Sequence, residues 1–110
     1  MNWDTIEKVV TNNDGDIEEL QREIFEWANS MFPGRTAWDA TCKLVLEEIP
    51  EWLQNPDDPG EYADLVIMIL DIASLKGINV KKAVQDKMKI NRERKWYIDP
   101  VTRTMHHVGD

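Results

Sequence analysis

The sequence is poor in several features that define whole classes of protein. It has one cysteine, Cys42, which excludes an internal disulfide framework and fits a reducing compartment. Its longest apolar run, from Leu65 to Leu70, is far too short to cross a membrane. The first residues lack the basic start and apolar stretch of a secretory signal peptide. We therefore expect a cytoplasmic protein that does not bind membranes.

Motifs of several common enzyme classes are also missing. The sequence has no internal repeat, no glycine-rich phosphate loop and no Ser/His or Cys/His arrangement suited to nucleophilic catalysis. His106 and His107 could bind a transition metal. They lie near the end of the chain with no cysteine beside them, which is a weak signal for such a site.

Positive charge is scarce in the first two thirds of the chain. Residues 1–75 hold four Lys/Arg against seventeen Asp/Glu, whereas residues 76–110 hold nine against four. The net charge of −8 makes nucleic acid an unfavourable partner. The acidic part could hold metal ions and the basic part phosphate. The basic segment could equally neutralise the acidic one within the fold.

The length and composition fit one small folded domain. A chain of 110 residues buries a modest core, so association between chains would help to stabilise it. Hydrophobic residues make up 42% of the chain and five are tryptophans, which indicates a folded protein rather than disorder. We predict an all-α fold, an antiparallel bundle of about four main helices with a short extended tail. The domain would span residues 1–110, with its core at about 16–96.

Capping and breaking residues divide the first half of the chain into helices. Residues 1–15 carry enough apolar side chains for a short helix. Asp16 is a candidate N-cap for a second helix, which Pro33-Gly34 should end. A third helix would start at Thr36. It should kink or end at Pro50, which has no backbone N–H and collides with the carbonyl four residues earlier.

The second half predicts two more helices and an extended tail. Residues 59–77 form a helix that is apolar almost all round, so we expect it to be central and buried. Asn79 can cap the next helix, over about residues 80–95. After Trp96, β-branched and aromatic residues around an Asp-Pro pair predict a hairpin-like tail.

Four carboxylates stand out on two neighbouring helices. Glu48 and Glu51 are three residues apart, as are Glu61 and Asp64, and residues at that spacing share one helix face. The loop over residues 54–60 is short enough to make the two helices antiparallel neighbours. Four carboxylates in one small volume would repel each other, so a cation is expected. A set of oxygen ligands suits Mg²⁺ or Mn²⁺ better than zinc.

The same carboxylates also admit a purely structural interpretation. Acidic residues at helical spacing are usually solvated, and Asp58 with Glu61 forms a capping-box pattern before Pro59. Against this, Glu61, Asp64 and Asp71 share a stripe on the most apolar helix, where buried carboxylates need a cation or donors. On the helix after it, Lys87 and two polar neighbours form either a phosphate-binding face or a solvated basic one.

Three motifs in this order resemble a known enzyme family. They are Lys43-Leu44-x-x-Glu47-Glu48-x-x-Glu51, Glu61-x-x-Asp64 and Lys87-Met88-x-x-Asn91-x-x-Arg94-x-Trp96. Over about residues 16–108 the chain resembles the MazG-like all-α nucleotide pyrophosphohydrolases, most closely their short phage and bacterial members. The resemblance implies a helical bundle that uses Mg²⁺, or Mn²⁺ as a substitute. It also implies hydrolysis of nucleoside triphosphates, usually deoxynucleotides, to monophosphate and pyrophosphate by homodimers or homotetramers.

The resemblance also implies roles for individual residues. The metal ligands would be Glu48, Glu51, Glu61 and Asp64, and the residues near the phosphates would be Lys87, Asn91 and Arg94. Either Glu47 or Glu48 could orient the attacking water as a general base. Asp71 could pair with Lys87 or Asn91 behind the metal ligands.

The base pocket is less defined by the sequence. Three tryptophans lie on helices that flank the carboxylates: Trp27, Trp38 and Trp52. An aromatic ring can stack on a base with little preference between bases, although each of these residues is more typical of a core. The alternative hypothesis is that the protein is not an enzyme but a helical module that keeps the bundle and binds a nucleotide or a protein. The intact set of four carboxylates favours the enzyme.

Overall fold

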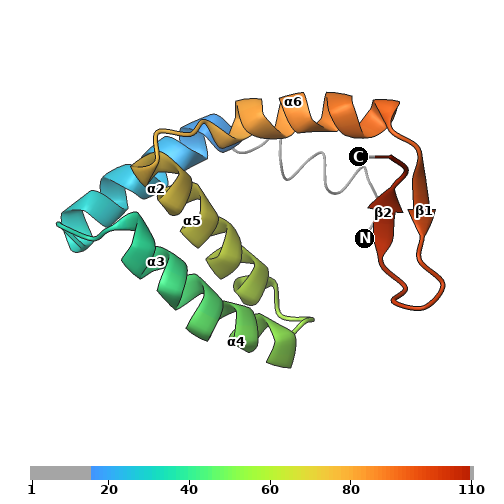
Figure 1. Cartoon of the computed structure of the whole chain (residues 1–110). Helices are drawn as coiled ribbons and strands as arrows, with labels where there is room; N and C mark the ends of the chain where they lie inside the picture. Colours follow the sequence, from blue (N-terminus) through green and yellow to red (C-terminus); the bar gives the residue numbers. More distant parts are fainter. Residues whose placement is uncertain (1–15, 110) are drawn as a thin grey trace. The chain divides into compact units, whose positions relative to one another are not determined.

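The computed structural model describes residues 16–109, which form helical runs followed by a two-stranded hairpin (Figure 1). The elements are α2 (Ile17–Met31), α3 (Ala37–Lys43), the π-helical segment η1 (Leu44–Glu48), α4 (Ile49–Gln54), α5 (Pro59–Leu75), α6 (Val80–Glu93), β1 (Trp96–Ile98) and β2 (Met105–His107). The all-α prediction with an extended tail is confirmed, and the helix predicted within residues 1–15 lies outside the described residues. No helix between residues 16 and 109 has the length and apolar character needed to cross a membrane.

The chain divides into two compact units, each with its own internal packing. Of the residues that the structure describes, the first unit covers 16–80 and the second 81–109. In the first unit, α2 and the run from α3 to α4 both pack on α5. Figure 1 shows the run from α3 to α4 lying alongside α5, with a tight turn joining the end of α4 to the start of α5.

Caps fix the helix boundaries of the first unit where the sequence predicts them. The side chains of Asp16, Thr36 and Asp58 each accept a backbone N–H of the following first turn, at 2.9–3.1 Å. Gly34 and Gly77 have φ angles of 83° and 71°, a conformation that side chains disfavour. Gly77 directly follows the C-cap of α5 and lets the backbone turn left-handed there, whereas Gly34 lies in the loop after α2, which ends at Met31.

The helical run from α3 to α4 passes through Pro50 instead of ending there. The N–H of Ile49 bonds to the carbonyl of Leu44, five residues back, and η1 is the wider turn that results. Pro50 then occupies the first turn of α4, where a missing N–H is tolerated. We expected the helix to kink or end at this proline. It does not end there but continues to Gln54 through one widened turn.

A buried glutamine joins both ends of the first unit. Gln21 in α2 donates from Nε2 to the Ser74 hydroxyl at 3.0 Å and to the Ile78 carbonyl at 2.8 Å. Its Oε1 accepts a hydrogen bond at 3.1 Å from the backbone N–H of Val80, the first residue of α6. One amide thus holds the end of α5 and the start of α6 against α2.

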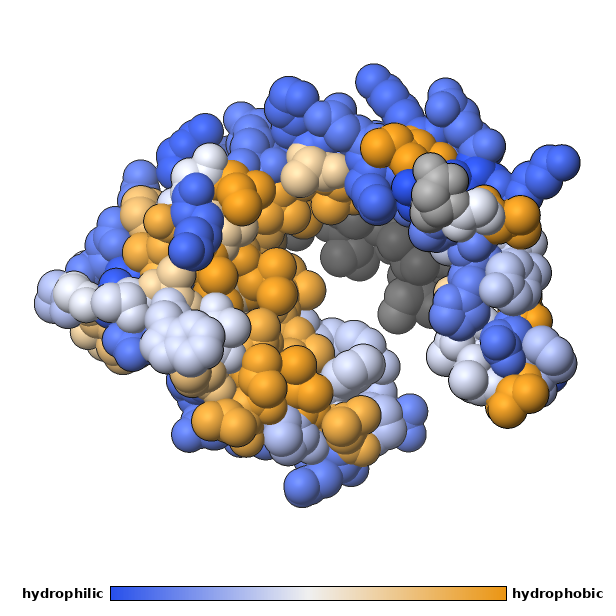
Figure 2. All heavy atoms as spheres, viewed as in Figure 1, coloured by the Kyte–Doolittle hydropathy of each residue, from blue (hydrophilic) through white to orange (hydrophobic). Residues whose placement is uncertain are grey.

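The apolar core of the single chain is small. Among the described residues, the buried apolar side chains are Ala28, Leu44, Leu70 and Ala73. We expected α5 to be the central and most buried helix. It holds two of these buried residues, Leu70 and Ala73, yet Val66 and Ile69 are 45% and 47% exposed. Figure 2 shows apolar side chains gathered on one face over α5. The central position of α5 is confirmed, since α2 and the α3–α4 run both pack on it, but among the described residues these helices cover only part of its apolar surface.

The second unit contains most of α6 and the C-terminal hairpin. The helix ends at Glu93, two residues before its predicted end. The strands β1 and β2 pair antiparallel with Trp96 opposite His107, and their rings contact edge to face. The connecting loop begins at Asp99, whose carboxylate accepts two backbone N–H groups at 2.8 and 3.0 Å. The predicted hairpin-like tail is therefore confirmed.

Candidate functional site

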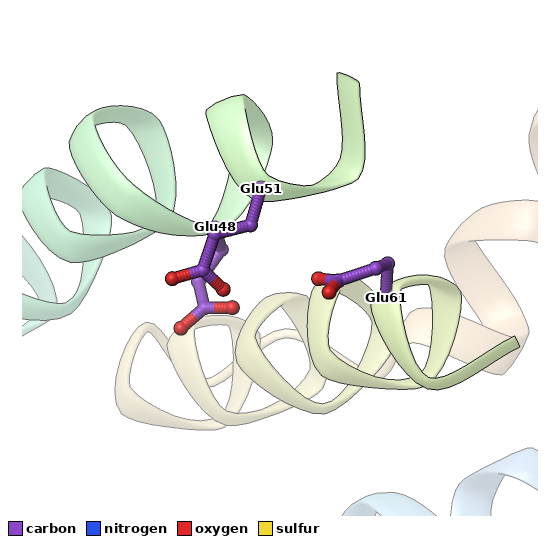
Figure 3. Close-up of side chains that lie close together, drawn as sticks. All are labelled: Glu48, Glu51 and Glu61. Atoms are coloured by element: carbon purple, nitrogen blue, oxygen red, sulfur yellow. The ribbon is translucent and has the colours of Figure 1, made fainter. Parts of the chain in front are cut away.

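Three of the four predicted metal ligands lie together. Glu48 at the end of η1 and Glu51 in α4 point toward Glu61 in α5 (Figure 3). One carboxylate oxygen of each lies within 4.8 Å of the other two. The short loop between the helices brings these residues together, as the sequence predicted. We call these three residues the carboxylate cluster.

Asp64 does not belong to this cluster. It lies one helical turn beyond Glu61 on α5 and is exposed. Its charge still acts on Glu61, so the two carboxylates are close enough to interact. Its role as a fourth ligand stays a prediction.

Two oxygens of the cluster are buried without a partner. Glu48 is 9% exposed, and neither its Oε2 nor Oε2 of Glu61 has a hydrogen-bond partner among the described residues. Buried polar atoms are almost always paired, because an unpaired one loses its hydration without compensation. Carboxylate oxygens are the ligands that hard divalent cations prefer, so the residues present fit such an ion.

The electrostatics of Glu61 also favour a cation. Burial raises the pKa of this carboxyl group, and the negative charges of Glu51, Asp58, Asp64 and Glu48 raise it further. Both effects disfavour its ionised form in the metal-free protein. A bound divalent cation would reverse this balance by supplying the largest positive charge in the site.

Lys43 is already paired with two of the glutamates. Its Nζ lies 2.8 Å from Oε2 of Glu47 and 3.0 Å from Oε1 of Glu48. These hydrogen bonds, first with Glu47 and then with Glu48, raise the pKa of the lysine above its usual range. The two candidate bases differ, since the Glu47 side chain is 61% exposed and that of Glu48 only 11%. Sequence reasoning gave Lys43 no role, although its spacing of four from Glu47 pointed to the pair.

A cavity of about 270 Å³ lies between α2, α3 and α5. Its apolar walls include Ile24, Trp27, Phe32, Ile67 and Met68, and its polar groups are Arg35, Asp39, Lys43 and Asp71. We call this cavity the apolar pocket. Its combination of apolar walls and a few polar groups is typical of a small-molecule site.

Asp71 has a partner that sequence reasoning missed. Arg35 donates from Nε and Nη2 to its two oxygens at 2.7 and 2.5 Å, and from Nη1 to Asn29 at 2.9 Å. Both side chains of the ion pair are nearly buried, at 12% and 10% exposure. We expected Lys87 or Asn91 as the partner of Asp71. The structure gives it Arg35, and a further contact with either residue of α6 stays a prediction. Helical spacing could not reveal this pair, because it joins two elements 36 residues apart.

The tryptophans do not form the core of the single chain. Trp27 is 53% exposed and Trp38 is 74% exposed, so a core position was the wrong expectation for both. Trp27 lines the apolar pocket and meets Phe32 edge to face at 5.8 Å. Trp52 is half-buried and packs edge to face against Tyr62 at 5.9 Å.

The candidate phosphate-binding residues lie in the second unit. Lys87 and Asn91 are on α6, and Arg94 directly follows its end. Lys87 is exposed, and the other two side chains are half-buried. Their contact with phosphate stays a prediction.

Comparison with known proteins gives consistent matches over most of the chain. The family model described as dATP/dGTP pyrophosphohydrolase matches residues 20–109. The dATP/dGTP diphosphohydrolase of Cyanophage S-2L is 42% identical over 82 residues, covering 73% of this chain and 77% of the relative. The protein of the same name from Salmonella phage PMBT28 is 43% identical over 82 residues. That match covers 74% of this chain but 28% of the relative, so the chain spans little more than a quarter of that protein.

A solved structure extends the comparison to the fold. The Cyanophage S-2L MazG-like pyrophosphohydrolase, bound to dGDP and three catalytic Mn²⁺ ions per active site, superimposes with a TM-score of 0.75 at 38% sequence identity. The match covers 86% of this chain and 99% of that one. The helical arrangement described above is therefore that of a MazG-like protein.

Proposed function

This chain belongs to the dATP/dGTP pyrophosphohydrolase family, and from that premise we propose that it hydrolyses deoxynucleoside triphosphates to the monophosphate and pyrophosphate. The observation that carries the proposal is the carboxylate cluster, in which Glu48 and Glu61 each keep one buried oxygen unpaired. The names of the two phage relatives and the dGDP and Mn²⁺ bound to the similar structure support it.

The proposed reaction is a single displacement at phosphorus. A water oxygen bonds to the α-phosphorus while the bond from that phosphorus to the bridging oxygen breaks. The bridging oxygen leaves with pyrophosphate, and one proton of the water passes to a carboxylate. Glu47 is the exposed candidate for this base, since Glu48 is better placed as a metal ligand by its buried unpaired oxygen.

The metal we propose is Mg²⁺, with Mn²⁺ as a substitute. Glu48, Glu51 and Glu61 would hold it, with Asp64 as the further predicted ligand. When bound, such an ion neutralises phosphate charge and lowers the pKa of water. Lys87, Asn91 and Arg94 would add positive and polar groups around the phosphates.

The apolar pocket is the proposed site for the base, which we take to be a purine. Trp27 and Phe32 provide aromatic surface on one side, and Asp39 provides a hydrogen-bond acceptor among apolar walls. An aromatic ring stacks on any base, so the polar groups of the pocket would decide between adenine and guanine. This assignment gives Trp27 the stacking role that the sequence analysis weighed against a position in the core.

We further propose that the protein acts as a homodimer or homotetramer. The main support is the apolar surface of α5 outside the apolar pocket, where Val66 and Ile69 are 45% and 47% exposed. Monomeric proteins rarely leave so much contiguous apolar surface in water. A second copy of the chain would cover this surface.

The test of the proposed reaction is release of pyrophosphate from a panel of ribo- and deoxynucleoside triphosphates. Each assay would be run with Mg²⁺, with Mn²⁺ and with a chelator. We expect metal-dependent release of pyrophosphate and monophosphate, highest with dATP or dGTP. Glu61→Gln should lower the rate by at least about a hundredfold, whereas Glu26→Gln, on the exposed side of α2, should not.

The main alternative is a non-catalytic helical module that binds a nucleotide. Absence of turnover with every triphosphate, together with tight nucleotide binding, would favour that module over the enzyme. Release of single phosphates would keep the metal site but contradict the proposed bond. Each result therefore separates the two functions or corrects the reaction.

A further inference from the structure

We propose that Lys43 is a further catalytic residue, which leaves Glu48 when a metal ion binds and then contacts the α-phosphate of the nucleotide. This inference rests on the proposed function, because it needs a nucleotide that spans the pocket and the carboxylates. In the metal-free chain the lysine is held by Glu47 and Glu48. The proposal therefore concerns a side chain that changes partners during the reaction cycle.

The position of Lys43 along its helix carries the first step of the argument. Ala40 lines the apolar pocket, Lys43 lines the same pocket one turn later, and Glu47 follows after one more turn. Lys43 is thus the residue that borders the pocket and also touches the glutamates. Consider a nucleotide with its base in the pocket and its outer phosphates at the carboxylate cluster. Its α-phosphate, the one next to the sugar, would lie beside Lys43.

Charge carries the second step. The ammonium group of Lys43 now neutralises Oε1 of Glu48, whose other oxygen is buried and unpaired. A divalent cation bound to Glu48 would bring two positive charges close to that ammonium group, and like charges at such a distance repel. Metal binding and the Lys43–Glu48 contact therefore compete for one carboxylate.

The freedom of the side chain carries the third step. The Lys43 side chain is 52% exposed, and its four-carbon stem can reorient without disturbing the helix. A released ammonium group beside the pocket would find its strongest partner in a phosphate oxygen. There it would stabilise the negative charge that grows on the α-phosphoryl group during hydrolysis.

Metal binding without nucleotide gives the first test. Mn²⁺ would be titrated into the wild type and Lys43→Gln, with calorimetric detection. We expect Lys43→Gln to bind Mn²⁺ about fivefold more tightly, because one competing positive charge near the ligands is lost. Equal or weaker binding by Lys43→Gln would overturn the competition, because a lysine that only supports the cluster would not oppose the metal.

Turnover and analogue binding give the second test. We expect Lys43→Gln to lower kcat about a hundredfold with little change in folding, and Lys43→Arg to restore much of it because the charge returns. Lys82→Gln is the matched control, since Lys82 also forms an i,i+4 pair, at 2.8 Å from Asp86. Unchanged kcat in Lys43→Gln would overturn the proposal.

Failure of this inference can be told apart from failure of the proposed function. A triphosphate with an imido group between its α- and β-phosphates resists cleavage at that bond, so its affinity reports contact without turnover. With Mn²⁺ present, we expect Lys43→Gln to bind this analogue about tenfold more weakly than the wild type. An inactive wild type would reject the proposed reaction, and the analogue would still decide the Lys43 contact. Equal analogue affinity would reject that contact.

Discussion

At the scale of single residues, the unpaired oxygens of Glu48 and Glu61 set the character of the site. Folding has buried these two carboxylate oxygens away from bulk solvent with no donor among the described residues, which lowers stability in the absence of a ligand. Such a loss is tolerated when the same atoms gain a cation in the working state. The site and the stability of the chain are therefore linked through these two residues.

Glu61→Gln should stabilise the metal-free protein at neutral pH. Burial and neighbouring carboxylates raise the pKa of Glu61 above its usual 4.5, so the folded chain binds this proton more tightly than the unfolded chain does. The stabilisation from that proton is fully present below the unfolded-state value and is lost as the pH rises through the folded-state value. Thermal unfolding in chelator should therefore show a higher midpoint for the variant at pH 7.

The gain from Glu61→Gln should shrink toward pH 4.5, because the wild-type group is then protonated as well. Glu26→Gln is the control, since this exposed residue of α2 lies outside the site. A lower midpoint for Glu61→Gln than for the wild type at pH 7 would contradict the argument. It would mean that Glu61 stabilises the metal-free fold.

Asp71→Asn should destabilise the chain strongly. It removes the charge that faces Arg35 and leaves a nearly buried guanidinium group without its counter-ion. We expect a loss of about 2 kcal/mol or more in the free energy of unfolding. Denaturant unfolding measures this, with Asp86→Asn as the control because its pair with Lys82 is exposed. Equal losses in the two variants would show that burial of the Arg35 pair adds nothing.

At the scale of the elements, the sequence predicted where helices begin and end because those signals are local. A capping side chain such as Asp16 bonds to N–H groups three residues away, and Gly77 acts on its own φ angle. The widened turn η1 was not predicted. It is a compromise between the missing N–H of Pro50 and continued packing on α5, and packing is not readable from spacing.

Pro50→Ala should weaken metal binding without weakening the fold. The new N–H could bond to the carbonyl of Leu46, so a regular α-helical turn becomes available in place of η1. That change would rotate Glu48 relative to Glu61. We expect Mn²⁺ affinity to fall about tenfold and the unfolding midpoint to stay or rise. Pro33→Ala, beyond the end of α2, is the matched control, and unchanged affinity in Pro50→Ala would refute the role of the turn.

At the scale of the whole molecule, many large apolar side chains between residues 16 and 109 are left exposed in the single chain. This is why the tryptophan predictions failed, since a pattern shows which face is apolar but not what covers it. The candidate site shows the same difference between local signals, which the sequence reveals, and tertiary packing, which it does not. Glu48, Glu51 and Glu61 were predictable because one short loop joins their helices, whereas Arg35 reaches Asp71 through tertiary packing alone.

Stability should depend on protein concentration if a second copy covers α5. Each tenfold dilution should then lower the apparent stability by about 1.4 kcal/mol per mole of dimer. Ile69→Lys should shift the sedimentation coefficient toward that of a single chain, because it places a charge on the apolar face. Val101→Lys is the control, as this hairpin residue is already 87% exposed. A concentration-independent midpoint in the wild type would contradict the assembly.

The widened turn η1 also bears on how this helix tolerates changes in length. A π-helical turn accommodates one residue more than the α-helix around it, so it behaves like an insertion absorbed without a loop. Deleting one residue within 44–48 would restore ordinary helical phase and still allow a folded chain. The deletion would remove the extra residue and leave the residues before and after it on the helix faces that they occupy now. Relatives that differ by one residue here would therefore align with a single gap and still present their acidic side chains in the same direction.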